Sequence, residues 1–164
     1  MRISGVNVVD LPAVHEVIRQ AVIHGVPITD CQRPELMQCL DSSLKQWQRW
    51  PDHAVHLAAW QDDHIVGVIL IKQYWNLANL FVLPAYQGQG VAKALLQQAM
   101  ILCEPHVPRI RLNSSVNAQG FYRSMGFEQT GECSGAPGGA IPFEYWFDGV
   151  RRTGAGQHTQ ALMS

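Results

Sequence analysis

Apolar residues recur at the spacing of an α-helix in two segments near the start of the chain. The first segment follows Asp10, a candidate N-cap, and carries Pro12 where a first helical turn accepts proline. The second segment ends before Pro51, which cannot continue a helix. Residues 24–34 lie between them and contain a glycine and two prolines, which indicates a loop. The apolar faces are Val14, Val17, Ile18 and Ala21 in the first segment and Leu36, Leu40, Leu44 and Trp47 in the second.

Short apolar runs bounded by turn residues predict β-strands over much of the remaining chain. Residues 54–60 and 64–72 are the clearest pair, because only Gln61, Asp62 and Asp63 separate them, as in a β-hairpin. The order of elements favours an α/β fold with a mixed, mostly antiparallel central sheet flanked by helices. The other predicted strands are residues 3–9, 76–84, 110–115, 127–132 and 142–147, and the other predicted helices are residues 90–103 and 117–125.

The composition is that of a globular protein, since 47% of the 164 residues are hydrophobic and 15% are charged. This length predicts a single domain over residues 1–150, followed by a flexible tail at residues 151–164 that is rich in Gly, Gln and Thr. A formal net charge of −1 argues against a nucleic-acid partner, and no apolar run is long enough to span a bilayer. We therefore expect neither nucleic acid nor a membrane as partner, and a homodimer stays open.

The cysteines carry no sign of metal binding or of secretion. Cys31, Cys39, Cys103 and Cys133 lack the spacing of metal ligands, so no metal site is predicted. The first ten residues lack the apolar core of a signal peptide. We therefore expect a cytoplasmic protein whose thiols are reduced.

A glycine-rich turn stands where a predicted strand meets a predicted helix, in the stretch LFVLPAYQGQGVAKALL of residues 80–96. The P-loop pattern GxxxxGK[ST] is absent, and Lys93 replaces the third glycine of a dinucleotide-binding GxGxxG. The remaining pattern, Q-x-x-G-x-A, could point the N–H groups of a helix N-terminus at an anion such as a diphosphate. Alternatively, glycine only supplies an unusual dihedral angle in an ordinary turn. These six residues leave both interpretations open.

A second motif lies further along the chain, in the stretch NSSVNAQGFYRSMGF of residues 113–127. Ala118, Phe121, Tyr122 and Met125 share one helical face, and Gly126 stands where a left-handed helix cap is typical. Together with LFVLP and the Q-x-x-G-x-A run, this motif resembles the GCN5-related N-acetyltransferase (GNAT) superfamily. The order of elements is similar across nearly the whole chain. The resemblance implies that the sheet is splayed between its fourth and fifth strands, with a bulge in the fourth.

The resemblance also implies that acetyl-CoA is the co-substrate. The pantetheine arm would lie in the gap between the two strands and pair with the backbone of Phe81 and Val82. Lys93 would add positive charge beside the pyrophosphate. Many relatives have a pantetheine-binding asparagine where this chain has Ser115, and Asn117 is the nearby substitute. The residues assigned to the pyrophosphate are Gln87, Gly88, Gln89, Gly90, Val91 and Ala92.

Tyr122 is the residue to which the resemblance assigns the chemistry. Its hydroxyl would donate a hydrogen bond to the departing thiolate, in the role of general acid. A thiol has a pKa of about 8.5 and a tyrosine of about 10, so complete proton transfer is uphill by roughly 2 kcal/mol. The alternative is a tyrosine that only packs between helix and sheet, which is a common position for a buried tyrosine.

No general base is assigned from the sequence. Relatives often carry a glutamate on the strand before the glycine-rich turn, whereas residues 76–84 contain no carboxylate and offer only Asn76 and Asn79. The proton of the acceptor amine would then pass to a water chain or to a residue from elsewhere in the chain. The candidates are Asp30, Glu35, His56 and Glu144.

The acceptor site is expected where three segments meet: the loop between the first two helices, the turn at Trp75, and residues 133–142. Aromatic side chains there could stack on an aromatic or apolar acceptor, although tryptophans are more often part of a core. These side chains are Trp47, Trp50, Tyr74 and Trp75.

Two functions of different classes are consistent with these features. The first is an acetyl-CoA-dependent N-acetyltransferase that acts on a primary amine of a small molecule or peptide, by direct attack of the amine on the thioester. The second is a non-catalytic acyl-CoA-binding sensor or regulatory module. Tyr122 favours the enzyme, whereas Ser115 and the missing strand carboxylate favour the sensor.

Overall fold

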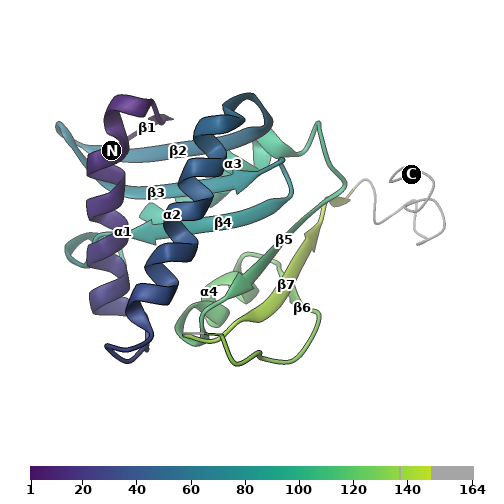
Figure 1. Cartoon of the computed structure of the whole chain (residues 1–164). Helices are drawn as coiled ribbons and strands as arrows, with labels where there is room; N and C mark the ends of the chain where they lie inside the picture. The colour runs from purple at the N-terminus through teal and green to yellow at the C-terminus, as the bar shows by residue number, and fades with distance from the viewer. Residues whose placement is uncertain (137, 149–164) are drawn as a thin grey trace.

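A seven-stranded sheet forms the centre of the molecule in a computed structural model that describes residues 1–136 and 138–148 (Figure 1). The strand order is β1-β2-β3-β4-β5-β7-β6, and β4 and β5 form its only parallel pair among the described residues. The fold class predicted from the sequence is thus confirmed. The strands are β1 Arg2–Gly5, β2 Ala54–Gln61, β3 His64–Lys72, β4 Asn76–Val82, β5 Arg109–Ser114, β6 Glu128–Gln129 and β7 Ile141–Trp146.

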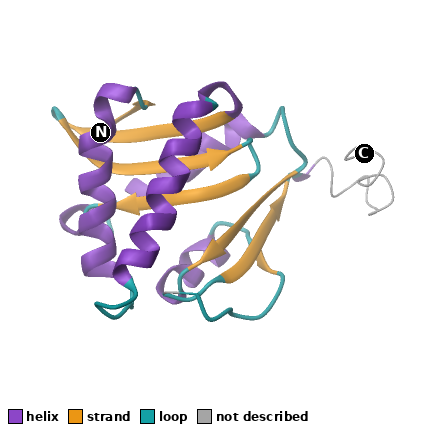
Figure 2. Ribbon diagram, viewed as in Figure 1, coloured by secondary structure: helices purple, strands orange, loops and turns teal. Residues whose placement is uncertain are grey.

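Helices cover both faces of the sheet (Figure 2). The helices α1 (Leu11–Gly25) and α2 (Arg33–Arg49) lie on one face of β1–β4, and α3 (Val91–Cys103) lies on the opposite face. The short helix α4 (Gln119–Ser124) packs on the same side as α3, over the half of the sheet that contains β5 and β7. The sheet therefore separates two hydrophobic cores.

The apolar periodicity of the sequence explains the two cores. The predicted faces of α1 and α2 are buried against β-strand residues such as Val68 and Leu70. The other core contains Leu95, Leu96 and Ala99 of α3, which pack on alternate residues of the same strands. β3 is buried and apolar from residue 65 to residue 71, as expected of a strand covered on both faces.

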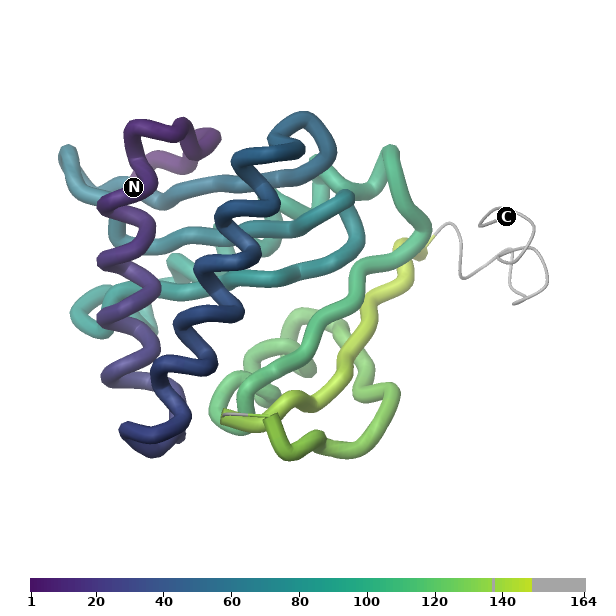
Figure 3. Tube along the Cα trace, in the orientation of Figure 1, coloured from purple at the N-terminus to yellow at the C-terminus, as the bar shows by residue number. Residues whose placement is uncertain are grey.

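The pairing between β4 and β5 is very short. Only Asn76–Arg111 and Leu77–Leu112 are paired, and the two strands diverge beyond them (Figure 3). A bulge lies at the same level, because Leu70 of β3 opposes Asn79 whereas Ile71 opposes Leu77, which leaves Ala78 as the extra residue. The splay and the bulge implied by the family resemblance are both present.

Two details near the N-terminus differ from the sequence-based expectation. Asp10 does not cap α1 with its side chain; its carboxylate accepts a hydrogen bond from the N–H of Asn7 at 2.9 Å. Pro34 does not belong to the preceding loop, because α2 begins at Arg33 and places Pro34 in its first turn, where the missing N–H costs nothing. The predicted tail at residues 151–164 lies outside the described residues.

No helix within the described part of the chain combines the length and the apolar character that crossing a bilayer requires.

His56 is a buried histidine in the core beneath α2. Its ring lies edge-on to Trp47 with the ring centres 4.4 Å apart, and neither ring nitrogen has a hydrogen-bond partner among the described residues. Burial lowers the pKa of His56 from 6.5 to about 4. The folded state therefore holds a neutral imidazole that the unfolded chain would protonate.

We expect the free energy of unfolding to fall as the pH drops from 6.5 to about 4, because only the unfolded state takes up a proton on His56 in this window. The full contribution, present above pH 6.5, is about 3 kcal/mol. Urea unfolding of the wild type and of His56→Leu across this range measures it. The leucine variant should lose this part of the pH dependence, whereas His64→Gln, at an exposed position, should keep it. Equal pH profiles for wild type and His56→Leu would show that His56 is not the source.

Candidate active site

The largest described cavity lies where β4 and β5 diverge, and we call it the β4–β5 cleft. Its volume is about 670 Å³. The end of α1, the last residues of β4, the glycine-rich turn, the first turn of α3 and the segment around α4 line it. Beyond Leu77, the edge of β4 that faces the cleft pairs with no strand of the described residues, so an extended ligand could pair with it there.

Gly88 and Gly90 both adopt dihedral angles that favour glycine. Their φ angles are 76° and 83°, and Gly90 is the N-cap residue of α3. A Cβ atom added at either position would meet no other protein atom within 4 Å. The turn thus needs glycine for its backbone shape and also leaves open space in front of that backbone.

The N–H groups of residues 88–93 are free. None of them donates to a backbone carbonyl of a described residue, and the first amide of α3 to do so is that of Ala94, which bonds to Gly90 at 3.0 Å. Gln87 holds the turn against β4, because its side-chain Nε2 donates to the carbonyl of Val82 at 3.1 Å. Free amides at a helix N-terminus carry partial positive charge, so this arrangement suits a bound anion.

The positions of the predicted co-substrate residues can be compared with the cleft. Nine of the ten assigned residues line it, and so do Ser115 and Tyr122. The nine are Phe81, Val82, Gln87, Gly88, Gly90, Val91, Ala92, Lys93 and Asn117. Gln89 does not line it; its side chain donates to the carbonyl of Ala85 at 3.3 Å.

Tyr122 lines the cleft from α4. It is 6% exposed and packs against Phe121, Phe127 and Phe143, with ring centres 5.2, 5.7 and 6.3 Å away. Its hydroxyl forms no hydrogen bond with another described residue and is therefore available to a ligand. Burial raises the pKa of Tyr122 above its ordinary value, so the side chain is a neutral hydrogen-bond donor.

Asn117 connects the segment before α4 to the end of α1. Its Nδ2 donates to the carbonyl of Gly25 at 3.0 Å. This bond commits the amide nitrogen to the protein, while Oδ1 keeps its capacity to accept. Ser115, the N-cap residue of the preceding turn, lies on the same wall of the cleft.

None of the four candidate bases lines the cleft. Asp30 pairs with Arg33 at 3.0 Å, and Glu35 lies in the first turn of α2. Glu144 accepts from Arg109 at 3.0 Å and from Trp146 at 2.8 Å.

The remaining polar groups near β4 do not supply a base either. His56 is buried beneath α2, and Asn79 is only 1% exposed and does not line the cleft. Among the described residues, the cleft thus contains neither a carboxylate nor an imidazole. No group of three or more His, Cys, Asp or Glu side chains in the described part of the chain could hold a metal ion.

The predicted acceptor site is not assembled as expected. The loop between α1 and α2 does approach the segment that leads into β7, since a Cβ atom at Gly138 would lie 2.6 Å from Val26 and 3.3 Å from Ile28 (Figure 3). The Trp75 turn, however, precedes β4 and lies at the opposite end of that strand from the glycine-rich turn. Trp47, Trp50 and Tyr74 line a separate cavity there.

Sequence reasoning missed the contribution of α1 to the cleft. Ala21, Gly25 and Val26 line it, as does Tyr86 just before the glycine-rich turn. Nothing in the local pattern of α1 marks these residues, because their position depends on how the helix packs across the sheet. Phe121 and Met125 also line the cleft, and their helical spacing with Tyr122 was the available signal.

Comparison with known proteins reveals clear similarity. A family model described as an acetyltransferase (GNAT) domain matches residues 31–138, more than half of the chain. The peptidyl-lysine N-acetyltransferase YjaB of Salmonella typhimurium is 28% identical over 104 residues, which cover 63% of this chain. The match spans 66% of the length of that relative, just under two thirds.

Solved structures share the fold. The PaiA N-acetyltransferase of Thermoplasma acidophilum, determined in complex with coenzyme A, aligns with a TM-score of 0.71 and 20% identity, covering 89% of this chain and 98% of that one. A ribosomal-protein-alanine N-acetyltransferase of Brucella melitensis aligns with a TM-score of 0.68 and 19% identity, covering 90% and 100% of the two chains. At these identities the likeness establishes the fold.

We predict that Gly90→Glu abolishes the binding of acetyl-CoA, because a carboxylate would enter the space in front of the free amides. Isothermal titration calorimetry measures the affinity. Gly90→Ala places a side chain on the same positive φ angle without adding a charge, so this variant should bind acetyl-CoA more tightly than the glutamate variant does. Gly120→Glu adds the same charge at an exposed position of α4 and should bind as the wild type does. A folded Gly90→Glu protein with wild-type affinity would contradict the assignment of the turn to the pyrophosphate.

Proposed function

The chain belongs to the acetyltransferase (GNAT) family, and on that premise we propose that it transfers an acetyl group from acetyl-CoA to a primary amine of a small molecule or peptide. One observation carries the proposal: the amides of residues 88–93 bond to no described backbone carbonyl, and five of these six residues line a cleft that also contains the unbonded hydroxyl of Tyr122. An anion-binding turn and a neutral proton donor in one cleft suit a phosphate-bearing thioester.

The residues present fit acetyl-CoA. The free amides of the glycine-rich turn would hold the pyrophosphate, and Lys93 in the first turn of α3 would add positive charge. The unpaired edge of β4 at Phe81 and Val82 would hydrogen-bond the pantetheine arm as a neighbouring strand does. The acetyl-CoA molecule would supply the thioester at the inner end of the cleft.

Tyr122 would act on the departing sulfur. The amine nitrogen forms a bond to the thioester carbonyl carbon, the carbon–sulfur bond breaks, and the sulfur leaves with the electron pair. The Tyr122 hydroxyl donates a hydrogen bond to that sulfur as its charge grows. Its raised pKa keeps the hydroxyl protonated and favours stabilisation of the thiolate over complete proton transfer.

The proton of the acceptor amine would leave through water. No carboxylate or imidazole of the described residues lines the cleft, so neither of these common side-chain bases can take the proton there. Water that enters the open cleft would then accept the proton, which is one of the two routes that the sequence left open. The acceptor itself would approach near the loop between α1 and α2, which borders the cleft at Val26.

The named activity of the curated relative, a peptidyl-lysine N-acetyltransferase, makes a peptide amine the first acceptor class to test. We also propose a cytoplasmic location, in which the four cysteines would stay reduced.

A second candidate function is an acyl-CoA-binding sensor without turnover. The absence of a carboxylate or imidazole from the described lining of the cleft favours it, because such a site could hold the co-substrate without activating an amine. The two functions predict different results when a panel of lysine peptides, peptide N-termini and small amines is assayed for thiol release from acetyl-CoA. We expect acceptor-dependent release with a peptide amine. Saturable binding of acetyl-CoA without release on any acceptor would instead support the sensor.

Tyr122→Phe is expected to lower kcat by roughly 10²–10⁴, the usual contribution of a positioned general acid, while the affinity for acetyl-CoA stays unchanged. The loss should appear in kcat, because the hydrogen bond strengthens only as the sulfur gains charge. The substitution keeps the ring and nearly all of its packing. Steady-state kinetics with the best acceptor and a binding titration of acetyl-CoA measure the two quantities.

Tyr86→Phe is the matched control, since it removes a second tyrosine hydroxyl from the lining of the same cleft. This variant should retain its turnover. A folded Tyr122→Phe enzyme that keeps more than about half of its kcat would contradict the role of Tyr122 as general acid, because even a tenfold loss corresponds to only ~1.4 kcal/mol.

A further inference from the structure

A second cavity, which we call the aromatic pocket, has no role in the function proposed above. Its volume is about 350 Å³. It shares no lining residue with the β4–β5 cleft. The last three residues of β4 line the cleft, whereas the turn before β4 lines the aromatic pocket, so residues 76–79, about 13 Å of extended strand, lie between the two sites. The aromatic pocket is lined chiefly by Gln46, Trp47, Trp50, His53, Lys72 and Tyr74.

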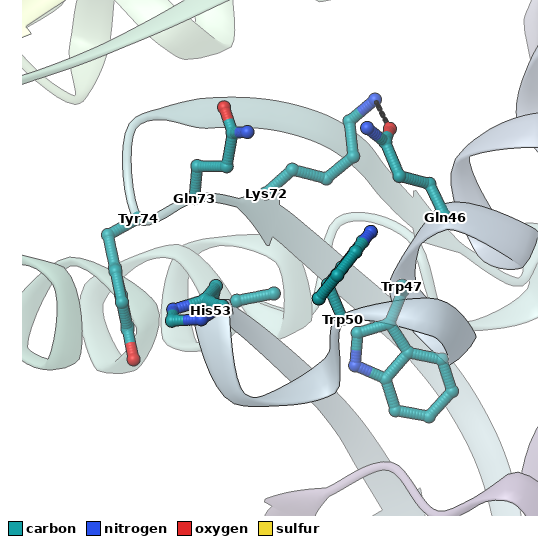
Figure 4. Close-up of a pocket in the computed structure, with 8 residues that line it drawn as sticks. Gln46, Trp47, Trp50, His53, Lys72, Gln73 and Tyr74 are labelled. Carbon is teal, nitrogen blue, oxygen red and sulfur yellow. Dashed lines mark hydrogen bonds between the residues drawn. The ribbon is translucent and has the colours of Figure 1, made fainter.

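Flat side chains form the walls of the aromatic pocket (Figure 4). His53 lies between Tyr74 and Trp50, and Lys72, Gln73 and Gln46 lie along one side of these rings. Trp50 is 59% exposed, which is unusual for so large an apolar ring, whereas the neighbouring Trp47 is buried. The pocket therefore presents an open aromatic surface that a planar ligand could cover.

Tyr74 is held rigidly in place. Its hydroxyl donates to the carbonyl of Asp52 at 2.9 Å, and its ring stacks on His106 with the ring centres 3.8 Å apart. The turn that carries it has positive φ angles at two non-glycine residues, 56° at Gln73 and 67° at Tyr74. Consecutive positive φ angles of this kind are typical of a tight turn between antiparallel strands, here β3 and β4. The wall formed by Tyr74 is thus prearranged.

The charge of the aromatic pocket favours an anion. Lys72 donates from Nζ to Oε1 of Gln46 at 2.9 Å, and it forms no ion pair with a carboxylate of the described residues. An ammonium group has three donors, so two remain for a ligand. No acidic side chain lines the pocket among the described residues, which argues against a cationic ligand.

We propose that the aromatic pocket binds a small planar aromatic carboxylate. The ring of the ligand would stack against the ring of Trp50, and its carboxylate would accept from Lys72. The two sites lie at opposite ends of β4, so the ligand binds independently of acetyl-CoA. The site is therefore separate from the acetyl transfer and does not depend on it.

Naphthoate and its neutral amide, naphthamide, are suitable probes, because they share one ring system and differ in charge. Calorimetric titration of the full chain should show saturable binding of naphthoate, about tenfold tighter than that of naphthamide. Lys72→Gln should remove this preference by weakening naphthoate alone. Trp50→Ala should weaken both probes about tenfold, and its exposed position makes a loss of folding unexpected.

Trp75→Ala is the matched control. Trp75 is also an exposed tryptophan. It follows Tyr74 in the turn between β3 and β4, but it does not line the aromatic pocket. This variant should bind naphthoate as the wild type does, and saturating acetyl-CoA should leave the naphthoate affinity unchanged. The proposal would be overturned by equal affinity for the two probes or by the absence of saturable binding. It would also be overturned if acetyl-CoA displaced naphthoate, or if Trp75→Ala weakened naphthoate binding as much as Trp50→Ala does.

Discussion

The early end of the pairing between β4 and β5 is the constraint on which the site depends. A sheet normally satisfies its backbone groups by continuous pairing, but here the two parallel strands pair at only two positions and then diverge. The extra residue Ala78 in β4 lies at this point and bends the strand away from its neighbour. The result is an open strand edge inside the molecule rather than at its border. The cleft forms along that edge.

The elements around the cleft are positioned by the same divergence. The glycine-rich turn follows directly after β4, so its free amides stand at the wide end of the gap. The segment after β5 leads into α4 and brings Tyr122 to the other wall. Asn117 then connects that wall to the end of α1 through its bond to Gly25. Three segments that are distant in sequence thus meet at one opening.

The electrostatics of the cleft are those of neutral donors. Backbone amides and the phenol of Tyr122 provide the polarity, Lys93 is the only charged side chain among the described lining residues, and no described carboxylate competes with an incoming anion. This arrangement suits a phosphate-bearing thioester and a sulfur that gains negative charge. In the reaction that we propose, deprotonation of the amine would therefore fall to solvent.

The sequence alone determined the local structure. Helical spacing, proline and glycine positions predicted the order of the elements, and Gly88, Gly90 and Gly126 mark turns whose positive φ angles the structure contains. These features depend on residues that are near one another in the sequence, so they can be predicted from its pattern.

The tertiary structure alone decided which segments share a site. It placed the end of α1 beside the cleft, buried His56 beneath α2, paired Glu144 with Arg109, and moved Trp50 and Tyr74 to a separate pocket. Such contacts arise from how helices pack across a sheet, a long-range arrangement that no local periodicity encodes.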